Sequence, residues 1–96
     1  MTDEQKKAYE QKIQAKLDEW QAEIDTLKAQ AKEKSADAQI DFNEKLANLE
    51  AKKEDATAKL EAIKSASESA WHDLKDGAHQ ATQDLGEAIK SARQHF

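Results

Sequence analysis

The large apolar residues of this chain recur at intervals of three or four, and this spacing constrains the fold more than any other feature. From Leu17 to Ala31 the steps alternate between three and four residues, which is the heptad spacing of a helix that packs along one face. The pattern favours amphipathic helices, each with one apolar face to cover. The first such face, which we call the association stripe, contains Tyr9, Ile13, Leu17, Trp20, Ile24 and Leu27.

Two further apolar stripes follow along the chain. The second stripe contains Phe42, Leu46, Leu49, Leu60 and Ile63. The third stripe contains Trp71, Leu74, Leu85, Ile89 and Phe96. We expect the second and third stripes to pack against one another, as in an antiparallel helical hairpin or coiled coil.

The composition supports helices and excludes several other classes of protein. The 96 residues include 18 Ala and only 2 Gly, with no Pro, no Cys and no Val. Ala, Glu, Lys, Gln and Leu are strong helix formers, whereas a β-rich fold needs β-branched and aromatic residues. Without Cys, a disulfide scaffold, a zinc ribbon and a thiol enzyme are excluded. No apolar run approaches the roughly 20 residues of a membrane span, and no apolar signal segment opens the sequence, so we expect a soluble, cytoplasmic protein.

Serine-rich segments mark the places where helices are expected to end. The best break is the segment 64–69, in which Ser65 and Glu68 have the spacing of a capping box and Ser67 is a competing N-cap. A weaker break lies at 34–37. There the apolar pattern thins, although alanines can carry the first stripe into the second.

The sequence therefore predicts a single all-α domain over residues 1–96. It favours a long helix over about 3–65, a hinge at about 65–68 and a shorter helix over about 68–95 that folds back on the long one. The alternative is a three-helix bundle with turns at both breaks.

The unequal lengths of the two expected helices have a consequence for assembly. The short helix can cover only the second stripe, so the association stripe would remain exposed. Six large side chains in one band form a patch larger than monomers usually expose. Two-fold pairing is the simplest remedy because such an interface is self-complementary. We therefore expect a homodimer or a higher even-numbered assembly with Trp20 in its interface.

Residue patterns that carry chemistry are scarce. Gly77 and Gly86 are isolated within a helical pattern, which indicates local softness or a close helix contact and not a phosphate loop. His72, Asp76 and His79 share one narrow arc, a spacing that could hold Zn²⁺ or Cu²⁺. That arc lies nearly opposite the third stripe, so we expect it to be a solvated face. We predict no catalytic, cofactor or metal site, and the net charge of -5 disfavours nucleic acid as a partner.

Three runs of sequence carry a resemblance to a known family: Trp20–Ala29, Leu60–Ala66 and Ser67–Gly77. In these runs the chain resembles a family of small bacterial coiled-coil stress-response proteins, seen in cyanobacteria and proteobacteria. More loosely, it is similar to late-embryogenesis-abundant and apolipoprotein-like helical proteins. The resemblance implies a non-enzymatic helical protein of the stress response, and we expect it to act through helix–helix association.

Two other modes of binding are consistent with the sequence. Residues 67–96 form an amphipathic segment with an aromatic residue near each end, so reversible binding to a lipid surface is the alternative function. The acidic residues of this segment outnumber its basic residues, however, and anionic lipid would repel it. The third mode is capture of a partner helix in a groove.

Overall fold

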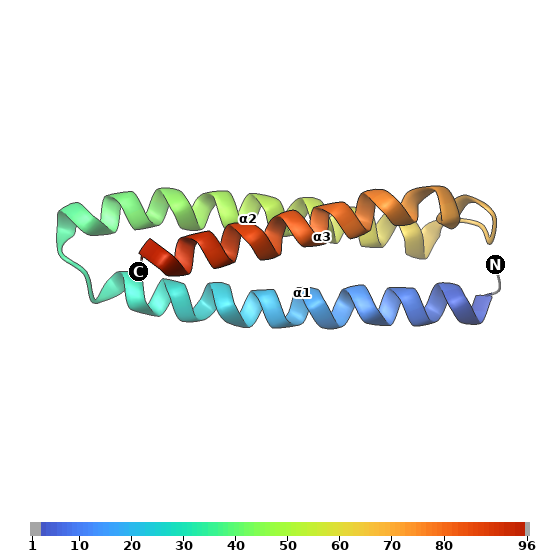
Figure 1. Cartoon of the computed structure of the whole chain (residues 1–96), viewed down its shortest axis with the longest axis horizontal. Coiled ribbons are helices and arrows are strands. Elements are labelled where there is room, and N and C mark those ends of the chain that lie inside the picture. The colour runs from blue at the N-terminus through green and yellow to red at the C-terminus, as the bar shows by residue number, and fades with distance from the viewer. Residues whose placement is uncertain (1–2, 96) are drawn as a thin grey trace.

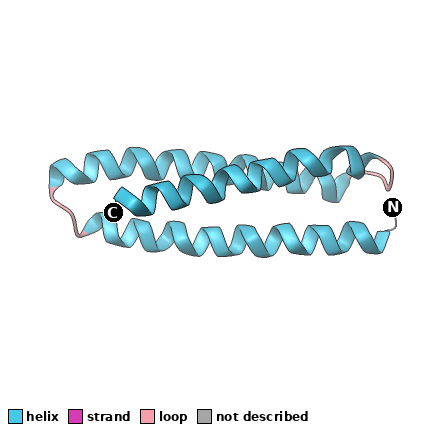
Figure 2. Ribbon diagram, in the orientation of Figure 1, coloured by secondary structure: helices cyan, strands magenta, loops and turns pink. Residues whose placement is uncertain are grey.

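The computed structural model describes residues 3–95 and contains three α-helices in that range. They are α1 (Asp3–Lys32), α2 (Ala36–Ser65) and α3 (Ala70–His95), and the described residues contain no strand. The helices lie side by side in a bundle of 51 × 18 × 16 Å, with α1 and α3 parallel and α2 antiparallel to both (Figures 1 and 2). The all-α fold class predicted from the sequence is confirmed.

The long helix expected over about 3–65 is wrong, because the chain turns between Lys32 and Ala36. Ser35 is the N-cap of α2: its φ of -60° and ψ of 160° are extended, and its side chain accepts a hydrogen bond from the backbone N–H of Ala38. The side-chain amide of Gln39 donates to the carbonyl groups of Lys32 at 3.2 Å and Lys34 at 2.8 Å. Both ends of the turn thus have partners for backbone groups that a helix end leaves unpaired.

The second turn lies between Ser65 and Ala70, close to the expected hinge at about 65–68. The hydroxyl of Ser67 accepts a hydrogen bond of 3.2 Å from the backbone N–H of Ala70, and the carbonyl of Ser67 accepts one of 3.1 Å from the N–H of Trp71. Ser67 is therefore the residue that caps α3. The start of α3 lies two residues later than expected, within the usual uncertainty of helix ends.

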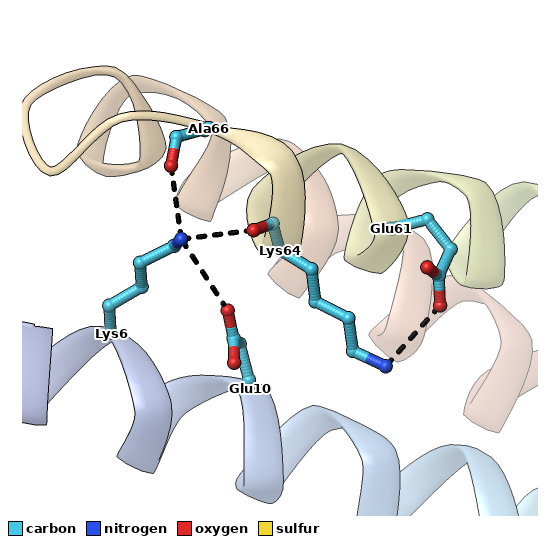
Figure 3. Close-up of polar contacts among 5 residues, drawn as sticks. All are labelled: Lys6, Glu10, Glu61, Lys64 and Ala66. Atoms are coloured by element: carbon cyan, nitrogen blue, oxygen red, sulfur yellow. Dashed lines mark hydrogen bonds and ion pairs between the residues drawn. The ribbon is translucent and has the colours of Figure 1, made fainter.

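A lysine of α1 closes the end of α2 at this turn (Figure 3). Lys6 Nζ donates to the carbonyl groups of Lys64 at 3.1 Å and Ala66 at 3.0 Å. It also lies 3.7 Å from a carboxylate oxygen of Glu10. An ammonium group is favourable at a helix C-terminus because the last carbonyl groups carry partial negative charge. This contact ties the beginning of α1 to the connection between α2 and α3.

The three helices bury their apolar faces in two clusters, a main core along the bundle and a smaller cluster around Trp71. Of the association stripe, Ile13, Leu17, Ile24 and Leu27 are buried, while Tyr9 and Trp20 are partly buried against the same core. The second and third stripes contribute Leu46, Leu49, Leu60, Ile63, Trp71, Leu85 and Ile89 as buried side chains, and Phe42 is partly buried. Leu74 differs from the expectation because its side chain is 39% exposed. Phe96 lies outside the described residues.

The expected homodimer depends on an exposed association stripe, whereas in this structure four of the six side chains are buried and Tyr9 and Trp20 are partly buried. The bundle turns at Ser35, so that α2 and α3 both pack against α1 and cover its apolar face from within the same chain. A second copy is not needed to cover it.

Replacing Ala36 with proline is expected to change the free energy of unfolding by less than about 1 kcal/mol, because the first residue of a helix has a spare N–H. The preceding residue, Ser35, is already in the extended conformation that proline requires of its neighbour. In a helix continuous over this position the same change would cost about 3 kcal/mol or more. Urea denaturation followed by circular dichroism distinguishes the two folds, and a large loss of stability would contradict the turn.

Candidate functional site

The seam between α1 and α3 is closed by polar contacts near its two ends. Near the start, the hydroxyl of Tyr9 donates a hydrogen bond of 2.9 Å to the carbonyl of Lys75. Near the other end, a guanidinium nitrogen of Arg93 lies 3.7 Å from a carboxylate oxygen of Glu23. Both pairs join α1 to α3, and between them the seam is occupied by an aromatic ring.

Trp20 fills the middle of this seam and packs against a glycine of the opposite helix. A Cβ atom at position 86 would lie 2.9 Å from Cζ2 and 3.3 Å from Cε2 of Trp20, so only glycine leaves room for the indole as it stands. Of the two interpretations that the sequence allows for Gly86, local softness or a close helix contact, the structure shows the close contact. The indole is only partly buried, and its Nε1 is buried without a hydrogen-bond partner.

The surface beside Trp20 is hollowed into two open cavities that we call together the α1/α3 groove. The first has a volume of about 400 Å³ and the second about 490 Å³. They share Trp20, Gly86 and Lys90. The first extends toward Lys12, Ile13, Lys16, His79, Thr82, Gln83 and Glu87, and the second toward Ile89, Arg93 and Gln94.

The floor of the groove is apolar and its rim is mainly cationic. Three lysines line the first cavity, against a single acid, Glu87. Lys16 Nζ lies 5.4 Å from the centre of a Trp20 ring, within the range of a cation–π interaction, and 3.5 Å from Glu19. Lys12 and Lys90 are exposed and make no hydrogen bond or ion pair with another described residue. The groove is therefore locally positive on a chain whose net charge is -5.

Among the ionisable groups along this seam, Tyr9 has a pKa that its environment clearly shifts. Burial raises the pKa of its phenol above the ordinary value of 10.0, and the negative charge of Asp76 raises it further. The folded chain therefore favours the neutral phenol. Its contribution to stability is complete below the ordinary pKa and is lost as the pH rises through the raised pKa.

The Tyr9→Phe variant is expected to be less stable than the wild type at neutral pH by about 1 kcal/mol, because the hydrogen bond to Lys75 is lost. The gap should narrow as the pH rises from neutral through the raised pKa of the phenol, since phenylalanine has no proton to lose. Thermal unfolding of both proteins across this range measures the difference. A gap that is constant or widens with pH would contradict the role assigned to the phenol.

The structure does not bring the three residues considered for a metal site into a metal-binding cluster. Among residues 3–95 no group of three His, Asp or Glu side chains could hold a metal ion. His72 instead packs edge-on against Trp71, with ring centres 6.4 Å apart and an interplanar angle of 88°. His79 lines the α1/α3 groove, and Asp76 is exposed.

A small hollow beside Leu74 is a second feature of the surface. It has a volume of about 150 Å³ and lies between α2 and α3, lined by Lys59, Ala62, Asp73, Leu74 and Gly77. A Cβ atom at Gly77 would meet no atom within 4 Å. The other large apolar side chain exposed among the described residues is Ile40, in the second turn of α2.

The two glycines of α3 form a natural pair for measuring the Trp20 contact. Gly77→Ala is expected to raise the free energy of unfolding by about 1 kcal/mol, because alanine is the better helix former and has open space there. Gly86→Ala gains the same propensity but displaces the indole, so its stability should fall at least about 1 kcal/mol below that of Gly77→Ala. Urea denaturation of both variants makes the comparison. Equal gains would show that Trp20 does not pack on Gly86.

Comparisons with protein-family models, curated proteins and solved structures found no match for this chain. None of the helices of the structure, over the residues it describes, has both the length and the apolar character to cross a membrane.

Proposed function

We propose that this chain is a non-enzymatic helical-bundle protein that acts by binding an amphipathic molecule in the α1/α3 groove. The observation that carries the proposal is the combination of an apolar floor, built on the exposed edge of Trp20 and on Ile13, with a rim of lysines. Small-molecule sites are concave and largely apolar, with a few polar groups that orient the ligand, and they have volumes of roughly 300–1,000 Å³. Both cavities of the groove have volumes in this range.

The resemblance to bacterial stress-response proteins suggests the physiological process in which such binding would take place. A binding role in the cytoplasmic stress response agrees with the expected non-enzymatic character. The mode differs from the helix–helix association expected from sequence, because the association stripe is covered by α2 and α3. In the groove the partly buried Trp20 of α1 remains accessible.

The proposal is tested with N-phenyl-1-naphthylamine, an uncharged apolar probe whose fluorescence rises on leaving water. We expect saturable binding to the wild type. Gly86→Leu fills the groove and should weaken this binding, whereas the matched Gly77→Leu places the same side chain on the same helix but outside the groove.

Two results would contradict the proposal. One is the absence of saturable probe binding to a wild type that circular dichroism shows to be folded. The other is an equal loss of binding in both leucine variants. If Gly86→Leu fails to fold, Gln83→Trp replaces it, because Gln83 is exposed, lines the same cavity and leaves the core unchanged.

A further inference from the structure

We infer that the ligand of the α1/α3 groove is a single-chain anionic amphiphile, such as a long-chain carboxylate, bound as a monomer. The inference rests on the proposed function and adds the chemical class of the ligand. The anionic head group would lie against the lysines of the rim, and the apolar chain would lie along the floor beside Trp20.

The shape of the groove fits one extended chain. Its two cavities share Trp20 and Gly86, and they follow α3 from His79 to Arg93. The fourteen helical steps from residue 79 to residue 93 span about 21 Å, so the groove is elongated along α3. A site of this form accepts a single flexible chain along its axis.

The charge of the groove selects the head group. Three lysines of the first cavity face the solvent, and Lys12 and Lys90 have no acidic partner among the described residues. Lys16 already has two partners, because its ammonium group forms an ion pair with Glu19 and lies over the Trp20 ring. An anion would supply partners that these ammonium groups lack, whereas a cationic head group would be repelled and a neutral one would gain only the burial of its chain.

The charge of the rest of the molecule favours a monomeric ligand over a bilayer. The net charge of the chain is -5, so an anionic membrane would repel the protein as a whole. On α3, Asp73, Asp76 and Asp84 are all exposed. The lysines of the groove are concentrated along one concave seam, where a single anion can approach them. A flat membrane surface of anionic head groups would, in contrast, also come close to the surrounding acidic residues and be repelled by them.

The experiment uses dodecanoate below the concentration at which it forms micelles, with dodecyl maltoside as a neutral ligand that has the same chain. Trp71→Phe leaves Trp20 as the one tryptophan of the chain, and the change removes no hydrogen bond because Nε1 of Trp71 has no partner. We expect a saturable change in Trp20 fluorescence. Dodecanoate should bind at least about tenfold more tightly than dodecyl maltoside, which corresponds to about 1.4 kcal/mol.

A triple variant tests the rim. Changing Lys12, Lys16 and Lys90 to glutamine should weaken dodecanoate binding about tenfold and leave the binding of N-phenyl-1-naphthylamine intact. The matched control changes three exposed lysines outside the groove, Lys7, Lys32 and Lys59, to glutamine. It alters the net charge equally and should change dodecanoate binding less than twofold.

Several outcomes would overturn the inference while leaving the proposed function standing. These are equal affinities for dodecanoate and dodecyl maltoside, or an equal loss of binding in the two triple variants, in a protein that still binds the uncharged probe. Binding to phosphatidylglycerol vesicles without binding to monomeric dodecanoate would identify a membrane surface as the ligand. A doubling of mass on binding would identify a second copy of the chain in the groove. Failure of the uncharged probe as well would remove the proposed function itself.

Discussion

Replacing Trp71 with alanine is expected to lower the free energy of unfolding by about 3–5 kcal/mol. Trp71 is 1% exposed and packs with Ile63 of α2 and Ala78 of its own helix. Its ring centre lies 5.9 Å from that of Tyr9 on α1. A single side chain thus joins all three helices at the end of the bundle where α2 turns into α3, and its loss would leave a cavity there.

The control for this prediction is Leu74→Ala, three residues later on the same helix. Leu74 is 39% exposed, so its truncation should cost less than about 1 kcal/mol. Urea denaturation followed by circular dichroism at 222 nm measures both variants. Similar losses for the two would show that the cluster around Trp71 does not hold α3 in place.

The helices themselves could be predicted from sequence because their signal is periodic and long. Every buried residue of α1, including the small residue Ala31, lies on the three-and-four spacing of the association stripe. In α3 the pattern again identifies the buried face with two exceptions: Leu74 is exposed beside Ala62 and Lys59, and Thr82 is buried although it lies outside the predicted stripe. Periodicity identifies the face of a helix that packs, but it does not say how closely the neighbouring helix approaches each position.

The first turn could not be decided from sequence because its local signals are weak. A serine N-cap contributes only about 1 kcal/mol, and alanine residues on both sides of Ser35 continue the helical pattern. An exposed association stripe can be covered by a second chain or by folding the same chain back, and both remedies bury the same side chains. In this structure the same chain folds back, and the side-chain amide of Gln39 donates to the carbonyl of Lys32 at the end of α1 and to that of Lys34 in the turn.

The α1/α3 groove was missed for a different reason. Trp20 and Gly86 are 66 positions apart, and nothing in the periodicity of either helix gives the register of one against the other. Lys12 and Lys16 look like a solvated face when α1 is considered alone, and Lys90 does so on α3. Only the placement of the two helices brings these cations to the rim of one apolar surface. An isolated glycine in a helix, interpreted as a close contact, was the one available signal.

The largest effect of all is expected from Ile24→Glu, which should unfold the chain at room temperature. Ile24 is 0% exposed in the core formed by the three helices. A carboxylate there has no cation to pair with in the apolar core and must either be buried at a cost of several kcal/mol or force the helices apart. Small domains have only about 5–15 kcal/mol of stability in total, so the loss of the isoleucine together with the burial of charge removes most of it.

This variant also separates a self-contained bundle from a dimer of long helices. In the bundle, the wild type is a monomer of 10.8 kDa and Ile24→Glu loses its helical signal at every protein concentration. The control Ala22→Glu, two residues earlier and exposed, should keep both the mass and the helicity. In a dimer paired through the association stripe, Ile24→Glu would instead change a two-chain mass to a one-chain mass while much of the helix survived. Light scattering after gel filtration, together with circular dichroism, measures both quantities, and the second result would restore the association stripe as the interface between two chains.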